Sequence, residues 1–257
     1  MNMHVLVVLR LVPDTDEDFE LDEEGKGIDR EWIGFKLNEF DDHALEEAVL
    51  LKEAVGAKVT AVALDGEGVD RLLQSALARG ADGVAKITHE LTDPVPASVA
   101  ARLFAAFANE NGCDLIVTGV QTVEDLFGQL APALGAVLDW PQVSAVSALK
   151  ADGEQIVVQQ EYSGGYSAAL SLSLPAVLGI QAASQPPRYV SGSKLRDVLG
   201  AKIAAVQLDV DASAPVGEVE SLGFPESSGH AEMVEGKAEE VAARLVAILR
   251  ERGFAKG

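Results

Sequence analysis

The sequence predicts an α/β protein built on a doubly wound, mostly parallel sheet of the adenine-nucleotide-binding type, with an antiparallel addition and a C-terminal extension. Three observations predict this fold. Short, almost continuously apolar runs are typical of strands that are buried on both faces of a parallel sheet. These runs alternate with helical patterns, which indicates right-handed crossover connections. After Pro141 the alternation stops, and two adjacent strand-like runs favour antiparallel pairing.

The first part of the chain contains four predicted strand–helix units. The strands are expected at residues 4–9, 58–64, 83–87 and 114–118. The helices are expected at residues 38–56, 68–79, 95–112 and 125–138. The first helix has the clearest start: Asn38 is a favoured N-cap, and Asp41 places a carboxylate in the first turn, where it complements the helix dipole.

An acidic excursion separates the first predicted strand from the first helix. Residues 14–24 hold eight acids in eleven positions, and Gly25-Lys26-Gly27 follows. We expect a solvated loop that contains a small hairpin. Long ordered loops at such a connection are often functional.

The later part of the chain changes character twice. Strand-like runs at 155–162 and 166–174 meet at Ser163-Gly164-Gly165, where two glycines suit a tight hairpin, and another apolar strand is expected at 175–180. Beyond residue 185 the chain becomes polar and locally basic.

A linker and a final helix complete the chain. Residues 212–229 are rich in Pro, Gly and Ser, and an amphipathic helix is expected over 238–252. We therefore predict an α/β domain at 1–185, followed at 186–257 by a recognition loop, a linker and a docking arm with a helix.

Charge and composition restrict the partners. The chain has 41 acidic and 20 basic residues, a formal net charge of −21. This balance argues against binding to nucleic acid or to an anionic membrane surface. Cys113 is the single cysteine, so no intrachain disulfide is expected, and no stretch approaches the roughly 20 apolar residues that cross a bilayer. We expect a cytoplasmic protein without membrane insertion.

The residues contain no complete catalytic constellation. The four histidines lack metal-ligand spacing, and there is no Walker loop, nucleophile elbow or Gly-x-Gly-x-x-Gly motif. Helix starts at Asn38 and near Gly128-Gln129 would offer N–H donors to an anion where open parallel sheets bind ligands. From the residues alone, a bound nucleotide and an empty, water-filled site are about equally favoured.

Seven stretches in register give the chain a family resemblance. It resembles the β subunit of electron transfer flavoprotein, the family that includes the FixA proteins, over roughly residues 5–200. The stretches are VVLRLVPD (7–14), LNEFDDHALEEA (37–48), SALARGAD (75–82), DLIVTGVQTVED (114–125), LDWPQV (138–143), LPAV (174–177) and PRYVS (187–191).

The resemblance implies an electron carrier rather than an enzyme. It implies a heterodimer with an α subunit that holds most of an FAD, and electron relay from flavoprotein dehydrogenases to a quinone reductase or similar acceptor. It places Phe40 and Glu161 near the flavin and an AMP at the switch point of the sheet. The carried-over AMP positions are Val8, Asn38, Glu39, Phe40, Asp41, Leu64 and the loop from Val123 through Leu134, which includes Glu124, Asp125, Gly128, Gln129 and Leu130.

The nucleotide loop departs from the family pattern. Where the family has DDDxNQTG, this chain reads EDLFGQLA at 124–131. Leu130 replaces a Thr whose hydroxyl would meet the AMP phosphate, and Gly128 replaces an Asn. Bifurcating members carry a second FAD and the sequence QVGP, where this chain reads QLAP at 129–132. AMP, a second FAD and an empty site are the three alternatives.

The recognition loop departs as well. After PRYVS the family has LPNIMKA, whose Leu anchors in the dehydrogenase, whereas this chain reads GSKLRDV at 192–198. Loss of a buried anchor removes a binding hot spot. Either the dehydrogenase differs, or Leu195 anchors from a shifted position. The partner-recognition residues carried over are Arg188, Tyr189, Gly192, Lys194, Leu195 and Arg196.

The runner-up interpretation is a stand-alone adenine-nucleotide-binding module of the stress or ATP-sensing type. That class needs Gly-rich phosphate contacts after the fourth strand, and Gly119-Val120-Gln121 supplies little of this. A third interpretation is a structural scaffold with an empty switch point.

Overall fold

The computed structural model describes residues 3–16, 18–91, 93–211, 219–224, 231 and 233–254. It contains two compact units, residues 1–220 and residues 221–257. The division at residue 220 reflects where contacts between the two units are few. It does not test the domain boundary predicted after residue 185, which stays a prediction.

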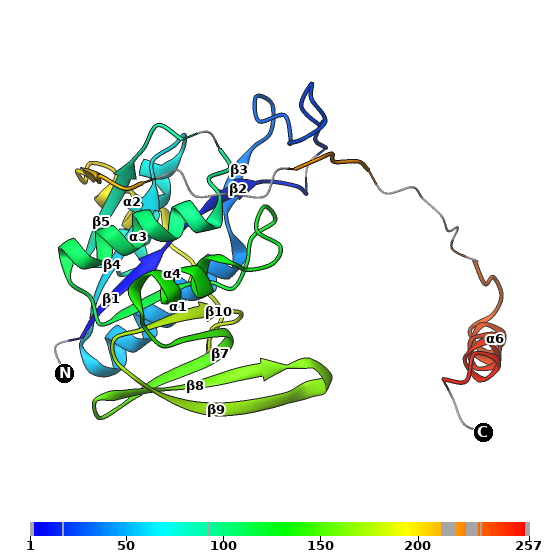
Figure 1. The fold of residues 1–257 in the computed structure, drawn as a ribbon. Helices are drawn as coiled ribbons and strands as arrows, with labels where there is room; N and C mark the ends of the chain where they lie inside the picture. Colours follow the sequence, from blue (N-terminus) through cyan, green and yellow to red (C-terminus); the bar gives the residue numbers. More distant parts are fainter. Residues whose placement is uncertain are drawn as a thin grey trace. The chain divides into compact units, whose positions relative to one another are not determined.

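The first unit is organised around one nine-stranded sheet (Figure 1). Its seven strands from β11 to β7 pair in parallel, and β8 and β9 add an antiparallel ribbon at one edge. The predicted α/β fold with a mostly parallel sheet is therefore confirmed. In spatial order the strands are β11 (Ala204–Gln207), β5 (Gly83–Thr88), β4 (Lys58–Leu64), β1 (His4–Val8), β6 (Leu115–Gly119), β10 (Ala176–Ile180), β7 (Gln142–Asp152), β8 (Gln155–Tyr162) and β9 (Tyr166–Ser173).

Helices cover both faces of the parallel part. The alternation of side chains along β1 explains this: Val5 and Val7 belong to one apolar core, and Leu6 and Val8 belong to the other. The first core includes residues of α1 (Glu39–Val55) and α2 (Val69–Arg79), and the second includes residues of α3 (Ala97–Asn111) and α4 (Leu130–Leu138).

The strand order creates a switch point beside β1. From β1 the chain proceeds to β4 and β5 on one side, and then returns to β6 on the other side. Connections leave the carboxyl ends of β1 and β6 in different directions, which opens a crevice where ligands bind in folds of this type.

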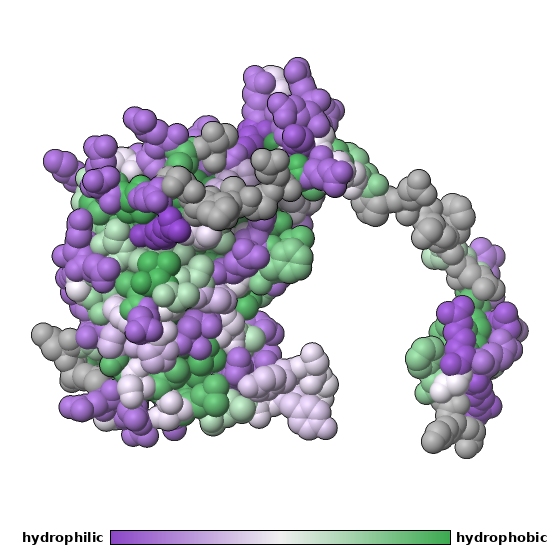
Figure 2. All heavy atoms as spheres, viewed as in Figure 1, coloured by the Kyte–Doolittle hydropathy of each residue, from purple (hydrophilic) through white to green (hydrophobic). Residues whose placement is uncertain are grey.

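The predicted excursion contains a hairpin, as expected. Strands β2 (Leu11–Pro13) and β3 (Phe35–Leu37) pair antiparallel at its base, and Leu21 bridges Ile28 farther out. Hydrophilic side chains gather over this region, which is dark blue at the top of Figure 1 (Figure 2).

Two strands and one helix escaped the sequence prediction. Strand β7 is only partly buried and carries a register shift near Ala145, whose φ is +57°, so it lacks an apolar run. The edge strand β11 and the short helix α5 (Gly192–Val198) are largely exposed, which removes the apolar pattern that would have indicated them.

One helix start was predicted wrongly. Helix α4 begins at Leu130 and not near Asp125. The residues from Val120 to Gln129 form a loop, because the carboxylate of Asp125 accepts the N–H groups that precede the helix.

The second unit contains α6 (Ala238–Glu251), as predicted, with none of its residues buried within that unit. Of the predicted linker, residues 212–218 and 225–230 lie outside the described residues. Within the described part of the chain, no helix is long and apolar enough to cross a membrane.

Candidate functional site: a switch-point pocket and an exposed edge

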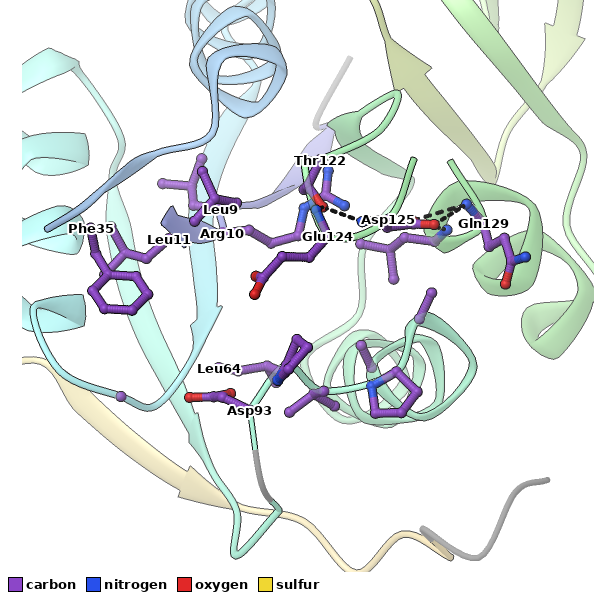
Figure 3. A pocket seen from close by; sticks show the side chains of 18 of the residues that line it. Leu9, Arg10, Leu11, Phe35, Leu64, Asp93, Thr122, Glu124, Asp125 and Gln129 are labelled. Atoms are coloured by element: carbon purple, nitrogen blue, oxygen red, sulfur yellow. Dashed lines mark hydrogen bonds between the residues drawn. The ribbon is translucent and has the colours of Figure 1, made fainter. Parts of the chain in front are cut away.

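A pocket of about 1010 Å³ opens at the carboxyl ends of β1 and β4, beside the loop that follows β6 (Figure 3). The acidic excursion, the loop before α3 and the loop before α4 complete its walls. One part of the lining is apolar, and it includes Leu9, Leu11, Phe35, Leu64, Val69 and Phe104.

A buried ion pair holds Arg10, which lines this pocket. The fully buried carboxylate of Asp41 accepts from Arg10 Nε at 2.9 Å and Nη2 at 2.7 Å, and from the backbone N–H of Gly119 at 2.6 Å. Arg10 Nη2 also donates to the carbonyl of Gly119 at 3.0 Å. Asp41 therefore joins the ends of β1 and β6 to the start of α1.

Gly119 is required for this close approach. A Cβ atom there would lie 2.5 Å from Asp41 Oδ1 and 2.6 Å from the Cβ of Phe40. The first turn of α1 thus packs directly against the end of β6. The sequence predicted only that the Asp41 carboxylate complements the helix dipole, and the structure adds its contacts with Arg10 and Gly119.

Asn38 precedes α1 as predicted, but its side chain does not cap the helix. Its Nδ2 donates instead to the carbonyl of Gln121 at 2.9 Å, and the residue is buried. Asn38 therefore ties the helix start to the loop after β6 and does not offer its amide to a ligand.

The loop before α4 uses its own polar groups. Asp125 accepts from the backbone N–H of Gln129 at 3.0 and 2.9 Å and from that of Leu130 at 3.3 Å. Thr122 Oγ1 accepts from the N–H of Glu124 at 3.2 Å and of Asp125 at 2.8 Å (Figure 3).

An ion pair connects the excursion to this loop. Arg30 Nη1 lies 2.5 Å from Glu124 Oε1, and the Arg30 guanidinium lies 4.8 Å from the centroid of the Phe35 ring. Burial raises the pKa of Glu124, the Arg30 guanidinium opposes this, and the charge of Asp93 raises the pKa further, with a net increase. Carboxylates thus crowd this wall of the pocket.

The structure separates the predicted cofactor positions into two groups. Leu64, Glu124, Asp125, Gln129 and Leu130 line the pocket. The other positions do not line it: Val8, Asn38 and Asp41 are buried, and Glu39, Phe40, Val123, Gly128 and Glu161 lie elsewhere.

Sequence reasoning missed part of the lining. Arg30 and Phe35 come from the excursion, Asp93 comes from the connection into α3, and Ser98 comes from the first turn of α3. The unusual length of the excursion was a usable signal for the first pair. No motif marked the second pair, which only the packing of α3 beside β4 and β5 brings to the crevice.

A second, exposed region lies at the ends of β8 and β10. Glu161 Oε2 accepts from Gln181 Nε2 at 3.1 Å, and the neighbouring Tyr162 and Tyr166 are 52% and 76% exposed. Gln181 follows Ile180, whose carbonyl accepts from the N–H of Val120. Glu161 therefore lies at the same edge of the sheet as the end of β6, against which Phe40 of α1 packs. We call residues 161–166 and Gln181 the hairpin edge.

Helix α1 anchors the chain that leaves this edge. Ser184 donates through its backbone N–H and its hydroxyl to Glu47 at 3.1 and 2.5 Å, and the N–H of Ala183 reaches His43 Nδ1 at 3.1 Å. Burial raises the pKa of Glu47, although the hydrogen bonds from Ser184 oppose the shift.

Arg188 completes this anchor. Its guanidinium contacts Glu46 at 2.8 Å and Glu53 at 2.7 Å, so it is used within the chain. Beyond it, Tyr189 is 93% exposed, Gly192, Lys194 and Arg196 are exposed as well, and Leu195 is half-buried in α5. Helix α5 contacts α2, and Gln74 Nε2 donates to the carbonyl of Leu199 at 3.0 Å.

No reactive cluster accompanies either region. Among the described residues, no group of three or more His, Cys, Asp or Glu side chains could hold a metal ion. His230 lies outside those residues. Cys113 has its thiol pKa raised to about 12 by burial and by Asp114, which makes the thiol a poor nucleophile.

Comparisons with known proteins agree with this arrangement. The model of the electron transfer flavoprotein domain matches residues 27–213. An electron transfer flavoprotein subunit beta of Methylophilus methylotrophus is 30% identical over 97% of this chain and 98% of its own length. The corresponding subunits of Bacillus subtilis and Mus musculus are each 28% identical, over 96% and 98% of this chain and 98% of their own lengths. The chain belongs to the electron transfer flavoprotein family, on the side of its β subunits.

Proposed function

We propose that this chain is one half of a heterodimer that relays electrons from flavoprotein dehydrogenases to a quinone reductase or similar acceptor. An α subunit would hold most of the FAD, and this chain would close one side of the flavin site. The hairpin edge carries the proposal. Its two tyrosines are exposed, and its Glu161 carboxylate is held by a hydrogen bond from Gln181 of the same chain.

The residues of the hairpin edge fit a flavin ring. Tyr162 and Tyr166 offer apolar ring surface, and Glu161 and Gln181 offer hydrogen-bonding groups held 3.1 Å apart. FAD would supply the redox chemistry when bound. The role of this chain is to orient the ring, to exclude water on one side and to hold an acid at a fixed place.

The segment that follows β10, residues 182–199, would meet the dehydrogenase. Arg188 and Glu47 anchor its base to α1, whereas Tyr189 protrudes into solvent. Tyrosine is one of the residues in which interface hot spots are enriched, so Tyr189 is the first anchor candidate. Leu195 in α5 is the second anchor candidate.

Co-expression with the α subunit tests the proposal. We expect a yellow complex that contains FAD and that a flavoprotein dehydrogenase reduces in the presence of its substrate. A colourless complex, or one that accepts no electrons from any such dehydrogenase, would contradict the proposal.

A matched pair of variants locates the flavin. Glu161→Gln keeps the hydrogen-bonding shape but removes a charge beside the proposed site, whereas Glu154→Gln removes a charge at the other end of the same hairpin. We expect only the first to change the flavin absorption spectrum or its reduction potential. Equal spectra for both variants would place the flavin elsewhere.

A further inference from the structure

We propose that Glu46 of α1 and Arg79 of α2 are positioning residues, which act from inside the fold to fix the geometry of the segment 182–199. The inference rests on the proposed function, in which this segment meets a flavoprotein dehydrogenase. The side chains of Glu46 and Arg79 are only 3% and 6% exposed, so opposite charges are buried beneath an exposed segment. Buried charges are costly unless they are paired and hydrogen-bonded, so their partners indicate their role.

Glu46 holds the segment by its backbone as well as by a side chain. The carboxylate accepts from the backbone N–H of Arg188 at 2.9 Å, from Arg188 Nε at 3.0 and 3.1 Å, and from Arg188 Nη2 at 2.8 Å. Paired bonds between a guanidinium and a carboxylate fix an orientation as well as a distance. Because Tyr189 follows directly, Glu46 sets the position from which this exposed side chain protrudes.

Two neighbours on α1 extend this hold along the segment. His43 Nδ1 accepts from the N–H of Ala183, and the Glu47 carboxylate accepts from the N–H and the hydroxyl of Ser184. Positions 43, 46 and 47 are three and four residues apart, so they share one face of the helix. Side chains of α1 therefore give the segment the hydrogen-bonding partners that a neighbouring strand would give it in a sheet.

Arg79 supplies a second cation beside Glu46. Its Nη2 lies 3.8 Å from Glu46 Oε2, and its Nη1 pairs with Asp42. Arg79 Nε has no hydrogen-bonding partner among the described residues, so the two carboxylates that the guanidinium faces account for its place. Asp42 and Glu46 would repel each other on one helix, and Arg79 offsets this repulsion. Arg79 thus keeps Glu46 charged and in place for Arg188.

The far end of the segment is held by the helix that carries Arg79. Helix α5 contacts α2, and Gln74 Nε2 donates to the carbonyl of Leu199 at 3.0 Å. One helix therefore holds the start of the segment, the next holds its end, and Arg79 pairs with α1. Between these fixed ends Tyr189 is exposed. Such preorganisation favours binding, because less freedom is lost when the partner docks.

Hydrogen exchange in the purified heterodimer tests the hold without reference to electron transfer. Glu46→Gln keeps the size of the side chain and removes the charge, whereas Glu53→Gln removes the exposed carboxylate that pairs with the same arginine. Peptides that cover residues 183–195 should exchange about tenfold faster in Glu46→Gln, with the peptides of β1 and β6 unchanged. Glu53→Gln should exchange like the unsubstituted complex, since an exposed ion pair contributes little. Equal exchange in both variants would overturn the inference.

Further variants keep this test decisive. Arg188→Ala removes the same guanidinium bonds from the solvent side, so it should also speed exchange, even if Glu46→Gln does not fold. Arg79→Met should speed exchange as well, and Arg79→Lys, which keeps a cation near Glu46, should exchange more slowly than Arg79→Met. Equal exchange in the two Arg79 variants would remove Arg79 from the inference, and unchanged exchange in Arg188→Ala would overturn it.

A cycle of double variants separates positioning from general stability. With a dehydrogenase that reduces the unsubstituted heterodimer, Glu46→Gln should raise the KM for the heterodimer about tenfold and leave kcat and the flavin absorption spectrum unchanged. In a Tyr189→Ala background the same substitution should add almost nothing, because Glu46 acts through the segment that carries Tyr189. Additive effects would overturn the inference. If no dehydrogenase reduces the unsubstituted complex, the proposed function fails, and the exchange experiment still decides this inference.

Discussion

The switch-point pocket and the hairpin edge lie on one sheet and use their polar groups in opposite ways. At the pocket, the lining residues Arg10, Arg30 and Asp125 all have charged or hydrogen-bonding partners within the chain. At the hairpin edge, Tyr162 and Tyr166 are exposed, and only the base of the segment is anchored. The comparison suggests that bonds within the chain hold the pocket walls in place, whereas the hairpin edge is open to a partner.

Asp41→Asn should give the largest loss of stability. Removal of its charge leaves Arg10 facing a neutral amide and weakens the contact with Gly119, so we expect the free energy of unfolding to fall by about 3 kcal/mol. Denaturant unfolding monitored by circular dichroism measures this change. The exposed control Asp152→Asn should stay within about 0.5 kcal/mol. A loss no larger than that of the control would show that the Arg10–Asp41 ion pair does not stabilise the fold.

Gly128→Ala should have the next largest effect. Gly128 and Gly153 have similar φ values, +62° and +60°, but only Gly128 has an atom within 4 Å of the added Cβ. Both Ala variants carry the conformational cost of about 1 kcal/mol, and the clash with Val120 should add about 1 kcal/mol at Gly128 alone. Equal melting temperatures for the two variants would argue against the tight loop.

Glu47→Gln should change the pH dependence of stability by a smaller amount. Burial raises the folded pKa of Glu47 above its ordinary value of 4.5, so the folded protein binds this proton more tightly than the unfolded chain. The contribution of Glu47 is therefore most favourable below pH 4.5 and declines as the pH rises through the folded pKa. Gln keeps an acceptor for Ser184 and removes this decline.

The test of this prediction is a series of unfolding curves from acidic to neutral pH. Relative to Glu154→Gln, which removes an exposed carboxylate, the Glu47→Gln variant should gain stability as the pH rises. A gain that appears only toward acidic pH would have the wrong sign.

Tyr189→Ala should have the smallest effect on stability. The side chain is 93% exposed, so we expect a change within about 0.5 kcal/mol. Electron transfer from the dehydrogenase should nevertheless fall by about tenfold, because an exposed aromatic on a fixed base is a hot-spot candidate. Trp32→Ala, an 84% exposed aromatic in the excursion, is the control and should leave transfer unchanged. Equal rates for both variants would remove Tyr189 from the interface.

The accuracy of the sequence prediction followed the burial of each element. Strands β1, β4 and β6 are apolar because both faces are covered, and their limits were predicted within one or two residues. The β8–β9 hairpin was predicted from Gly164 and Gly165, both of which have positive φ. Strand β7 was missed because it is only partly buried and lacks an apolar run, and β11 was missed because its side chains are largely exposed.

The candidate site was only partly predictable for a related reason. A strand end and a helix start identified Leu64 and Gln129 as pocket residues, because parallel strands place their carboxyl ends along one edge, whereas Leu130 was named only from the family resemblance. The hydrogen-bonding partners did not follow from this rule. Asn38 reaches Gln121, and Arg30 reaches Glu124 across 94 positions, which no local pattern indicates.

The sequence by itself determined the fold class, the order of most buried elements and the absence of a familiar catalytic motif, because alternating apolar runs and glycine turns are local properties. Only the tertiary structure decided what the polar residues do. Asp125 was a candidate phosphate neighbour in the sequence, and in the folded chain its carboxylate accepts from the N–H groups of Gln129 and Leu130. Such a choice depends on which groups meet across the sheet, and that is set by packing.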